Sequence, residues 1–349
     1  MTPKLAFSRN RPLSVRPGYA LKALPWLTRF AWASRPAAFR RGTEALTSLQ
    51  RPALKSFEAL CADAGVGDQL HRRGHIILVE EERHREAAHR QVETMVEHDI
   101  DAVWLEPDGV YEIASELTAN IGAIHVRDSG HVADPLAVCR GLLVAFTNAG
   151  GRFDRNHVSR VDRVARGRFR LTLQDGTLEA GRVVVCAGAW SRPLCQSLGF
   201  DVPLDTERGY HVQANGWHGS FDIAIASFDR MTIMTPLADG LRITGFVEIG
   251  GLELPPNPKR LTTLNRHLSE LLPKSDTSDR SEWMGFRPSM PDHLPVIGVS
   301  PDDPDLLFAF GHQHLGLTLA GTTADIVASL ATTGRSDIDL GAFRVDRFQ

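Results

Sequence analysis

The chain has 349 residues, of which 42% are hydrophobic and 23% charged, and its formal net charge is -3. This composition is typical of globular proteins, and the length predicts two joined domains, because one hydrophobic core seldom serves so many residues. The sequence contains no run of about 18 apolar residues, so it predicts no membrane-spanning helix. The small net charge gives no reason to expect nucleic acid as a partner.

The N-terminal part is strongly basic. Residues 1–43 contain nine Lys or Arg and no Asp or Glu, a bias found in transit peptides and in surfaces that face anionic lipid. Residues 20–32 mix Trp with basic residues, as helices at a membrane interface do, although an ordinary packed helix is the alternative. Four cysteines without a CxxC pair favour a reducing compartment. We therefore expect a cytoplasmic protein with a candidate peripheral contact to the inner membrane through residues 20–32.

The first half of the chain reads as helices and short strands. Apolar residues at helical spacing predict a helix over residues 43–64, and the charged stretch 80–98 predicts a solvated helix. Short apolar runs predict strands at 75–79 and 122–126. Asp134 and Pro135 supply an N-cap and a first-turn proline for a helix that reaches Ala149.

The second half begins with a hairpin. Residues 169–173 and a turn at 174–177 lead into a buried strand over 182–188. Alternating segments between 204 and 249 predict an antiparallel sheet with one wet face, followed by a helix over 259–272. A buried strand at 306–310 and a helix at 318–331 end the pattern. Parallel-type strands interrupted by an antiparallel block predict a discontinuous nucleotide-type domain with an inserted substrate domain.

The glycine-containing turn from Gly311 to Thr318 lies between the last strand and the last helix. We expect free backbone N–H groups at Leu315, Gly316, Leu317 and Thr318, where a helix start favours negative charge, as on a reduced flavin. Gly311 and Gly316 let the backbone approach a flat ring, and Thr318 offers a hydroxyl. A tight strand-to-helix connection without a ligand has the same spacing.

Arg287 lies in an apolar run, where an arginine requires an anionic partner. That partner is either an internal carboxylate or a substrate carboxylate held by two hydrogen bonds. Tyr210 could donate its hydroxyl to the same carboxylate or act as a packing residue. No residue is assigned as a catalytic base, and no set of residues predicts a metal site.

These segments resemble the flavin-dependent D-amino-acid dehydrogenase and oxidase family, which includes glycine and sarcosine oxidases. Gly285-Phe286-Arg287-Pro288 is similar to the family motif whose arginine binds the substrate carboxylate, and Glu207-Arg208-Gly209-Tyr210 also matches. The resemblance implies FAD as cofactor and a small amino acid as substrate: a D-amino acid, glycine, sarcosine or a hydroxyproline-type compound. It further implies hydride transfer from Cα to flavin N5, with quinone or oxygen as electron acceptor. It places Arg287 and Tyr210 at the substrate. It places the following residues at the cofactor: Val158, Ala187, Gly188, Trp190, Gly311, His312, Leu315, Gly316, Leu317 and Thr318.

The family pattern begins with a strand and a GxGxxG turn, and the sequence shows no such turn. The expected fold is therefore mixed α/β, with an incomplete FAD-binding Rossmann-like domain and an inserted antiparallel-sheet substrate domain. The expected FAD-binding domain comprises 1–42, 131–200 and 283–349, without its first βαβ unit, and the substrate domain comprises 43–130 and 201–282. The alternative is a truncated, inactive remnant or a non-catalytic subunit.

Overall fold

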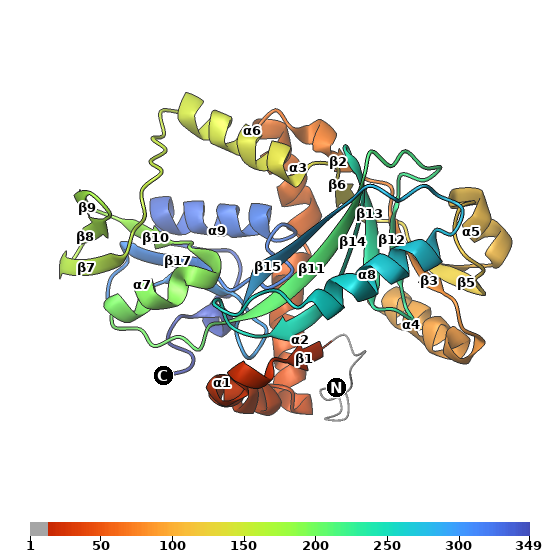
Figure 1. The fold of residues 1–349 in the computed structure, drawn as a ribbon. Coiled ribbons are helices and arrows are strands. Elements are labelled where there is room, and N and C mark those ends of the chain that lie inside the picture. The colour runs from red at the N-terminus through yellow and green to blue at the C-terminus, as the bar shows by residue number, and fades with distance from the viewer. Residues whose placement is uncertain (1–12) are drawn as a thin grey trace.

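The computed structural model describes residues 13–349, which form one body around a large sheet and another around two small sheets (Figure 1). The large sheet has nine strands in the order β15-β11-β14-β13-β12-β3-β5-β4, with β1 paired to β14. Neighbouring strands are antiparallel except β1 with β14 and β12 with β3. Its strands are β1 Leu13–Val15, β3 His75–Val79, β4 Ala102–Leu105, β5 Gly122–Val126, β11 Asp205–Asn215, β12 Ala224–Ser227, β13 Thr232–Leu237, β14 Gly240–Ile249 and β15 Arg280–Ser289.

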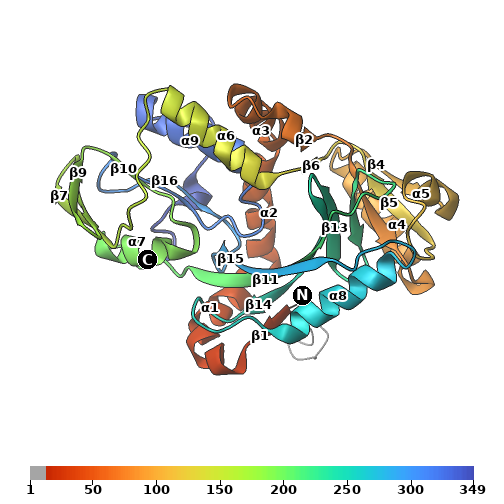
Figure 2. The same ribbon diagram turned by 45° about the horizontal axis from the view of Figure 1, so that its top comes forward.

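The two faces of this sheet have different environments. On one face, Tyr210, Val212 and Ile243 pack against Leu264 and Leu268 of α8 (Pro258–Leu271), in a core that also contains Val110 from α5 (Pro107–Ile113). On the other face, α4 (Arg85–Glu97) covers only the end formed by β3, β5 and β4. Figure 2 shows α8 running along its side of the sheet. The uncovered face of β15, β11, β14 and β13 is therefore free to form a site.

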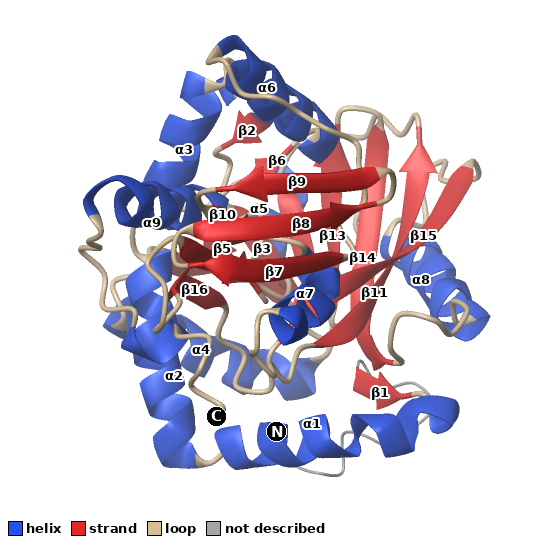
Figure 3. Ribbon diagram, turned by 90° about the vertical axis from the view of Figure 1, so that its left-hand side faces the viewer, coloured by secondary structure: helices blue, strands red, loops and turns tan. Residues whose placement is uncertain are grey.

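The second body contains the sheet β10-β17-β16, in which β10 and β17 are parallel, and the antiparallel sheet β7-β8-β9 (Figure 3). Aromatic residues such as Phe169, Phe308 and Phe310 fill the core between them. The remaining elements of the fold are β2 Leu70–His71, β6 His131–Val132, β7 Arg160–Ala165, β8 Arg168–Leu173, β9 Gly176–Ala180, β10 Val183–Val185, β16 Val296–Val299, β17 Leu306–Phe310, α1 Ala20–Ala33, α2 Pro36–Gln50, α3 Ala53–Asp63, α6 Pro135–Asn148, α7 Ser191–Ser197 and α9 Ala320–Thr333.

Several local predictions are confirmed. Strands at 75–79 and 122–126 have the predicted bounds, and the Asp134 side chain accepts hydrogen bonds from the N–H groups of Leu136 and Ala137 at the start of α6. The mixed α/β fold class is confirmed as well. A continuous helix over 43–64 is wrong, because α2 begins at Pro36 and a turn at Arg51 and Pro52 separates α2 from α3.

The domain ranges remain a prediction. β15 pairs with β11 along its length, so the expected boundary at 283 falls inside a strand of the large sheet. The long helix α2 connects α1, at one end of the molecule, with α3 at the other (Figures 1 and 3).

Candidate functional site

Two segments predicted to face the cofactor leave the small sheet at one edge. β10 and β17 are parallel neighbours, with Val185 opposite Phe308, and their carboxyl ends lead into residues 187–190 and into the turn that begins at Gly311. Ligands of open α/β sheets bind outside the carboxyl ends of such strands. Large apolar side chains are exposed here, because Trp190 is 55% and Leu317 39% accessible. The structure therefore brings Ala187, Gly188 and Trp190 to the same edge as the Gly311–Thr318 turn.

The end of β15 reaches the same edge from the large sheet. Ser289 forms an isolated bridge with His312, and the Gln313 N–H donates to the Pro288 carbonyl at 2.9 Å. The rings of Trp190 and Phe286 meet edge to face, with centroids 5.9 Å apart. The motif around Arg287 and the two segments predicted to face the cofactor thus lie together, although they are far apart in sequence.

The Gly311–Thr318 turn differs in detail from the prediction. The helix α9 begins at Ala320 and not at Thr318, and the Leu315 N–H is not free, because it donates to the His312 carbonyl at 2.9 Å. Within residues 13–349, the N–H groups of Gly316, Leu317 and Thr318 have no hydrogen-bond partner. Three donors consequently remain to meet electron-rich atoms of a ligand.

Both histidines of this turn are held in the neutral form at pH 7. Burial lowers the pKa of His312 to about 4, and its Nε2 lies 3.1 Å from the Thr323 hydroxyl of α9. Although His314 is exposed in part, burial lowers the pKa of its ring, and the charge of Arg287 lowers it further. Neither ring therefore adds positive charge beside Arg287.

Arg287 has little internal compensation for its charge. Its side chain is partly buried, its Nη1 donates to the Phe246 carbonyl at 2.9 Å, and burial lowers its pKa. Glu207 lies opposite it on β11, yet no carboxylate in the described part of the chain comes within 4 Å of the guanidinium. Several of the five guanidinium N–H groups are thus available to a ligand.

The Phe246 carbonyl, which accepts the hydrogen bond from Arg287, lies in a β-bulge of β14. The register of β14 against β11 shifts between Arg208 and Tyr210, and Phe246 lies in the left-handed region with φ 65°. Such a conformation is costly for an aromatic residue and is typical of functional sites. Here the bulge orients the carbonyl that holds Arg287.

Glu207 and His293 belong to the site but were missed by sequence reasoning. Glu207 is buried, and its Oε1 lies 3.4 Å from His293 Nε2. Burial raises the pKa of Glu207, but the contact with His293, together with smaller contributions from other neighbours, outweighs this effect, so the pKa is lowered overall. The charge of this buried carboxylate opposes the effect of burial on the pKa of Arg287, without an ion pair between the two groups. Side chains alternate between the two faces of a strand, so Glu207 lies on the same face of the sheet as Arg287. This alternation is the sequence signal that could have identified Glu207.

Tyr210 lies on the opposite face of β11. It is 1% exposed, its hydroxyl donates to Glu248 at 2.8 Å, and the Asn257 N–H donates to that hydroxyl at 3.0 Å. The single hydroxyl proton is therefore already used, and the structure leaves Tyr210 none for a substrate carboxylate. Its role here is to satisfy a buried carboxylate next to Arg208, whose Nη1 is 3.7 Å from Glu248.

Two facing glycines form the floor of the site. Gly209 and Gly285 are directly opposite across β11 and β15. A Cβ on Gly209 would lie 2.2 Å from Arg287 Nη2, and a Cβ on Gly285 would lie 2.1 Å from the Trp283 ring. The guanidinium and the indole therefore lie directly on bare backbone, side by side. Sequence reasoning assigned no role to Trp283.

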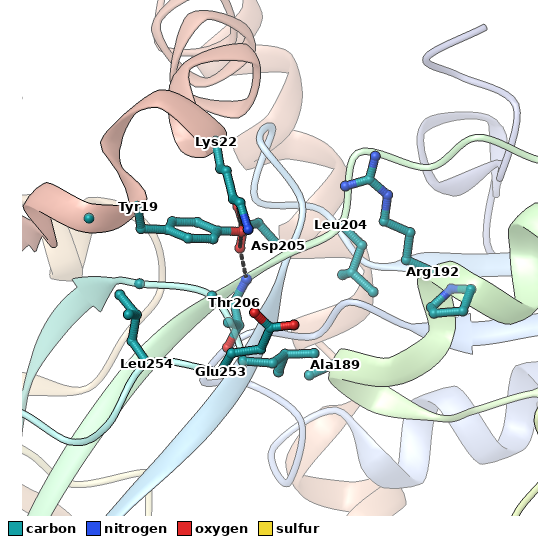
Figure 4. Close-up of a pocket in the computed structure, with 14 residues that line it drawn as sticks. Tyr19, Lys22, Ala189, Arg192, Leu204, Asp205, Thr206, Glu253 and Leu254 are labelled. Atoms are coloured by element: carbon teal, nitrogen blue, oxygen red, sulfur yellow. Dashed lines mark hydrogen bonds between the residues drawn. The ribbon is translucent and has the colours of Figure 1, made fainter.

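Two further features are Val158 and one cavity. Val158 packs against the core of the second body, which also contains Phe308 and Phe310 of β17. A cavity of about 300 Å³ is lined by α1, α7, β11 and the loop 250–254 (Figure 4). There Tyr19 and Lys22 extend toward Asp205, and burial, followed by the charge of Asp205, raises the pKa of Tyr19 to about 12. Arg287 does not line this cavity, so it is not the predicted substrate site.

The residues at the sheet edge fit the ring half of a flavin. They provide three unpaired N–H groups, exposed apolar side chains at Trp190 and Leu317, and Gly188 with open space around its Cβ position. Within residues 13–349 no strand leads through a GxGxxG turn into a helix, so the described residues supply no such cradle for a pyrophosphate.

Comparison with known proteins agrees with this fit. The chain is 30% identical over 347 residues to a D-amino-acid oxidase of Bradyrhizobium diazoefficiens, covering 97% of this chain and 81% of that protein. It is 26% identical over 359 residues to a D-amino acid dehydrogenase of Neisseria meningitidis, covering 96% and 82%. Glycine oxidase from Geobacillus kaustophilus has the same fold, with a TM-score of 0.74 at 22% identity over 91% of this chain and 85% of that one. The sequence model of the FAD dependent oxidoreductase family matches residues 15–330, and the chain belongs to this family, whose cofactor is FAD.

Proposed function

We propose that this protein dehydrogenates an amino acid whose carboxylate binds to Arg287. The observation that carries the proposal is a partly buried guanidinium with one backbone acceptor and no carboxylate within 4 Å in the described chain, next to the cofactor edge. A carboxylate with two oxygens matches the free side of such a fork. The amino-acid oxidases and dehydrogenases among the relatives support this substrate class.

Bound FAD would supply the acceptor for the hydride that leaves the substrate Cα. The residues of the chain make two contributions, of which the first positions the substrate and the second stabilises charge. The Phe246 carbonyl and the bare backbone of Gly209 fix the guanidinium, so that the substrate carboxylate has one location. The free N–H groups of Gly316, Leu317 and Thr318 stabilise negative charge at the end of the last strand. His312 is held by Thr323 and stays neutral, which suits a positioning role.

The proposal is tested by substituting Arg287 in protein reconstituted with FAD. Arg287→Ala removes charge-assisted hydrogen bonds and should raise KM on the order of 100-fold for glycine and for D-alanine. Arg287→Lys keeps the charge but loses the fork, so it should recover only part of the loss. An unchanged KM in Arg287→Ala would refute the role of Arg287. A refolded protein that binds no FAD would favour the non-catalytic alternative.

We also propose that α1 contacts anionic lipid, with a membrane quinone rather than oxygen as the electron acceptor. Leu21 is 87%, Leu24 55% and Trp32 65% exposed, on a helix that carries basic and no acidic residues. Within residues 13–349 no helix has both the length and the apolar content required to cross a bilayer. Co-sedimentation with phosphatidylglycerol vesicles, but not with phosphatidylcholine vesicles, and loss of binding in Leu21→Ser/Trp32→Ser would support the contact. Oxygen consumption equal to total turnover would refute the quinone.

A further inference from the structure

Trp283 is an exposed aromatic residue beside the proposed carboxylate site. It is 59% accessible, and its ring is stacked on His211 with centroids 5.1 Å apart and an interplanar angle of 25°. Large aromatic side chains are usually buried, so an indole exposed within a site is a candidate ligand contact.

The position of Trp283 relative to Arg287 follows from the strand register. The guanidinium of Arg287 lies over Gly209 and the indole of Trp283 lies over Gly285. These two glycines are directly opposite each other on β11 and β15. The Cβ positions of directly opposite residues lie roughly 5 Å apart. A carboxylate bound to Arg287 therefore places the next substrate carbon within reach of the Trp283 ring.

The row that begins at Trp283 continues across the uncovered face of the sheet. His211 is opposite Trp283, Thr244 is opposite His211, and Ile233 is opposite Thr244. Ile233 is 45% exposed, and three strand spacings separate it from Trp283, roughly 14 Å. Burial and, to a smaller extent, the charge of Arg242 lower the pKa of His211 to about 4, so the row is uncharged at pH 7. This surface is long enough for a large side chain, and its exposed members are apolar.

We infer that Trp283 and His211 form the subsite for the substrate side chain, and that the preferred substrate is an amino acid with an aromatic side chain. The inference rests on the proposed function, because Arg287 defines where the side chain begins. Glycine makes no use of this subsite, so the ratio of kcat/KM for phenylalanine to that for glycine reports on it directly. The assay uses both enantiomers of phenylalanine.

In FAD-reconstituted protein, Trp283→Ala should lower the phenylalanine-to-glycine ratio about tenfold, the value of one aromatic stacking contact. Trp283→Phe should restore most of the ratio, and Phe153→Ala, which removes an exposed aromatic ring elsewhere, should leave it at the wild-type value. A second measurement does not depend on turnover. Phenylacetate and acetate are titrated calorimetrically, and Trp283→Ala should weaken phenylacetate binding relative to acetate by a similar factor.

The outcomes separate this inference from the proposed function. If wild-type protein oxidises amino acids but Trp283→Ala leaves both ratios within twofold of wild type, the side-chain subsite is refuted and the proposed function stands. If no amino acid is oxidised while phenylacetate binding still depends on Trp283, the proposed reaction fails and the subsite stands.

Discussion

Gly209→Ala tests the link between the glycine floor and Arg287. The added Cβ would lie 2.2 Å from Arg287 Nη2 and 2.3 Å from Cζ. An unstrained contact requires roughly 3.5 Å, so the guanidinium must move by about 1.3 Å. The guanidinium is the end of a flexible side chain and can move at little cost in folding free energy. Its hydrogen bond to the Phe246 carbonyl at 2.9 Å would not survive such a movement.

The expected result is a loss of activity without a loss of stability. A misplacement of about 1 Å in a positioned group can lower catalysis on the order of 100-fold, so kcat/KM for glycine should fall by 10- to 100-fold. Steady-state kinetics measures this fall, and the melting temperature should stay close to the wild-type value. Gly42→Ala is the matched control, because a Cβ at that position meets no atom within 4 Å.

A double-mutant cycle decides whether Arg287 transmits the effect. In an Arg287→Ala background, Gly209→Ala should cost almost nothing further, because the group that it displaces is gone. An equal loss of kcat/KM in both backgrounds would refute the reasoning, and so would a large fall in melting temperature.

Three further predictions concern other contacts. Tyr210→Phe removes the hydroxyl that donates to Glu248 Oε1 and accepts from the Asn257 N–H, and it should lower the free energy of unfolding by about 1–3 kcal/mol in a urea titration; a raised KM at unchanged stability would instead support a substrate role. Gly321→Ala places a Cβ 2.5 Å from the Ser56 backbone at the contact of α9 with α3 and should destabilise by about 1–3 kcal/mol, and an unaltered urea midpoint would contradict this packing. The pKa of His312 falls from 6.5 to about 4 on folding, so its contribution to stability is complete above pH 6.5 and is lost as the pH falls from 6.5 toward 4. His312→Gln should therefore lose less stability than wild type between pH 7 and pH 4.5, and parallel pH profiles would refute the assignment.

Local features were predictable because neighbouring residues determine them. The Asp134 cap and the strand at 75–79 required only propensity and spacing. The turn at Arg51 and Pro52 was missed, since the helical spacing of apolar residues continues through it. Arg287 and the turn at Gly311 were predicted from motif resemblance, and the structure brings them to one sheet edge.

The parts of the site that were missed depend on strand register, which sequence does not specify over long separations. Only the pairing of β11 with β15 places Gly209 opposite Gly285 and Glu207 opposite Arg287. The same pairing, together with β14, determines which face each side chain occupies. Tyr210 thus enters the core beside Glu248, although its sequence neighbour Gly209 lies under Arg287.

The bulge at Phe246 also constrains the length of β14. Before the bulge, the buried side chains Leu241 and Ile243 are at odd positions, and after it the buried side chains Phe246 and Glu248 are at even positions. Ile249 is buried as well, but in a different cluster with Ala23 and Trp26 of α1. Deleting one residue at the bulge would restore regular pairing but would rotate half of the strand, exposing Leu241 and Ile243 and driving Arg242 and Thr244 into the core. Substitutions in β14 can be absorbed locally, whereas a single-residue deletion reverses which face of the sheet half of this strand's side chains occupy. Variation in this strand is therefore restricted to residue identity, and insertions or deletions must occur in the loops on either side.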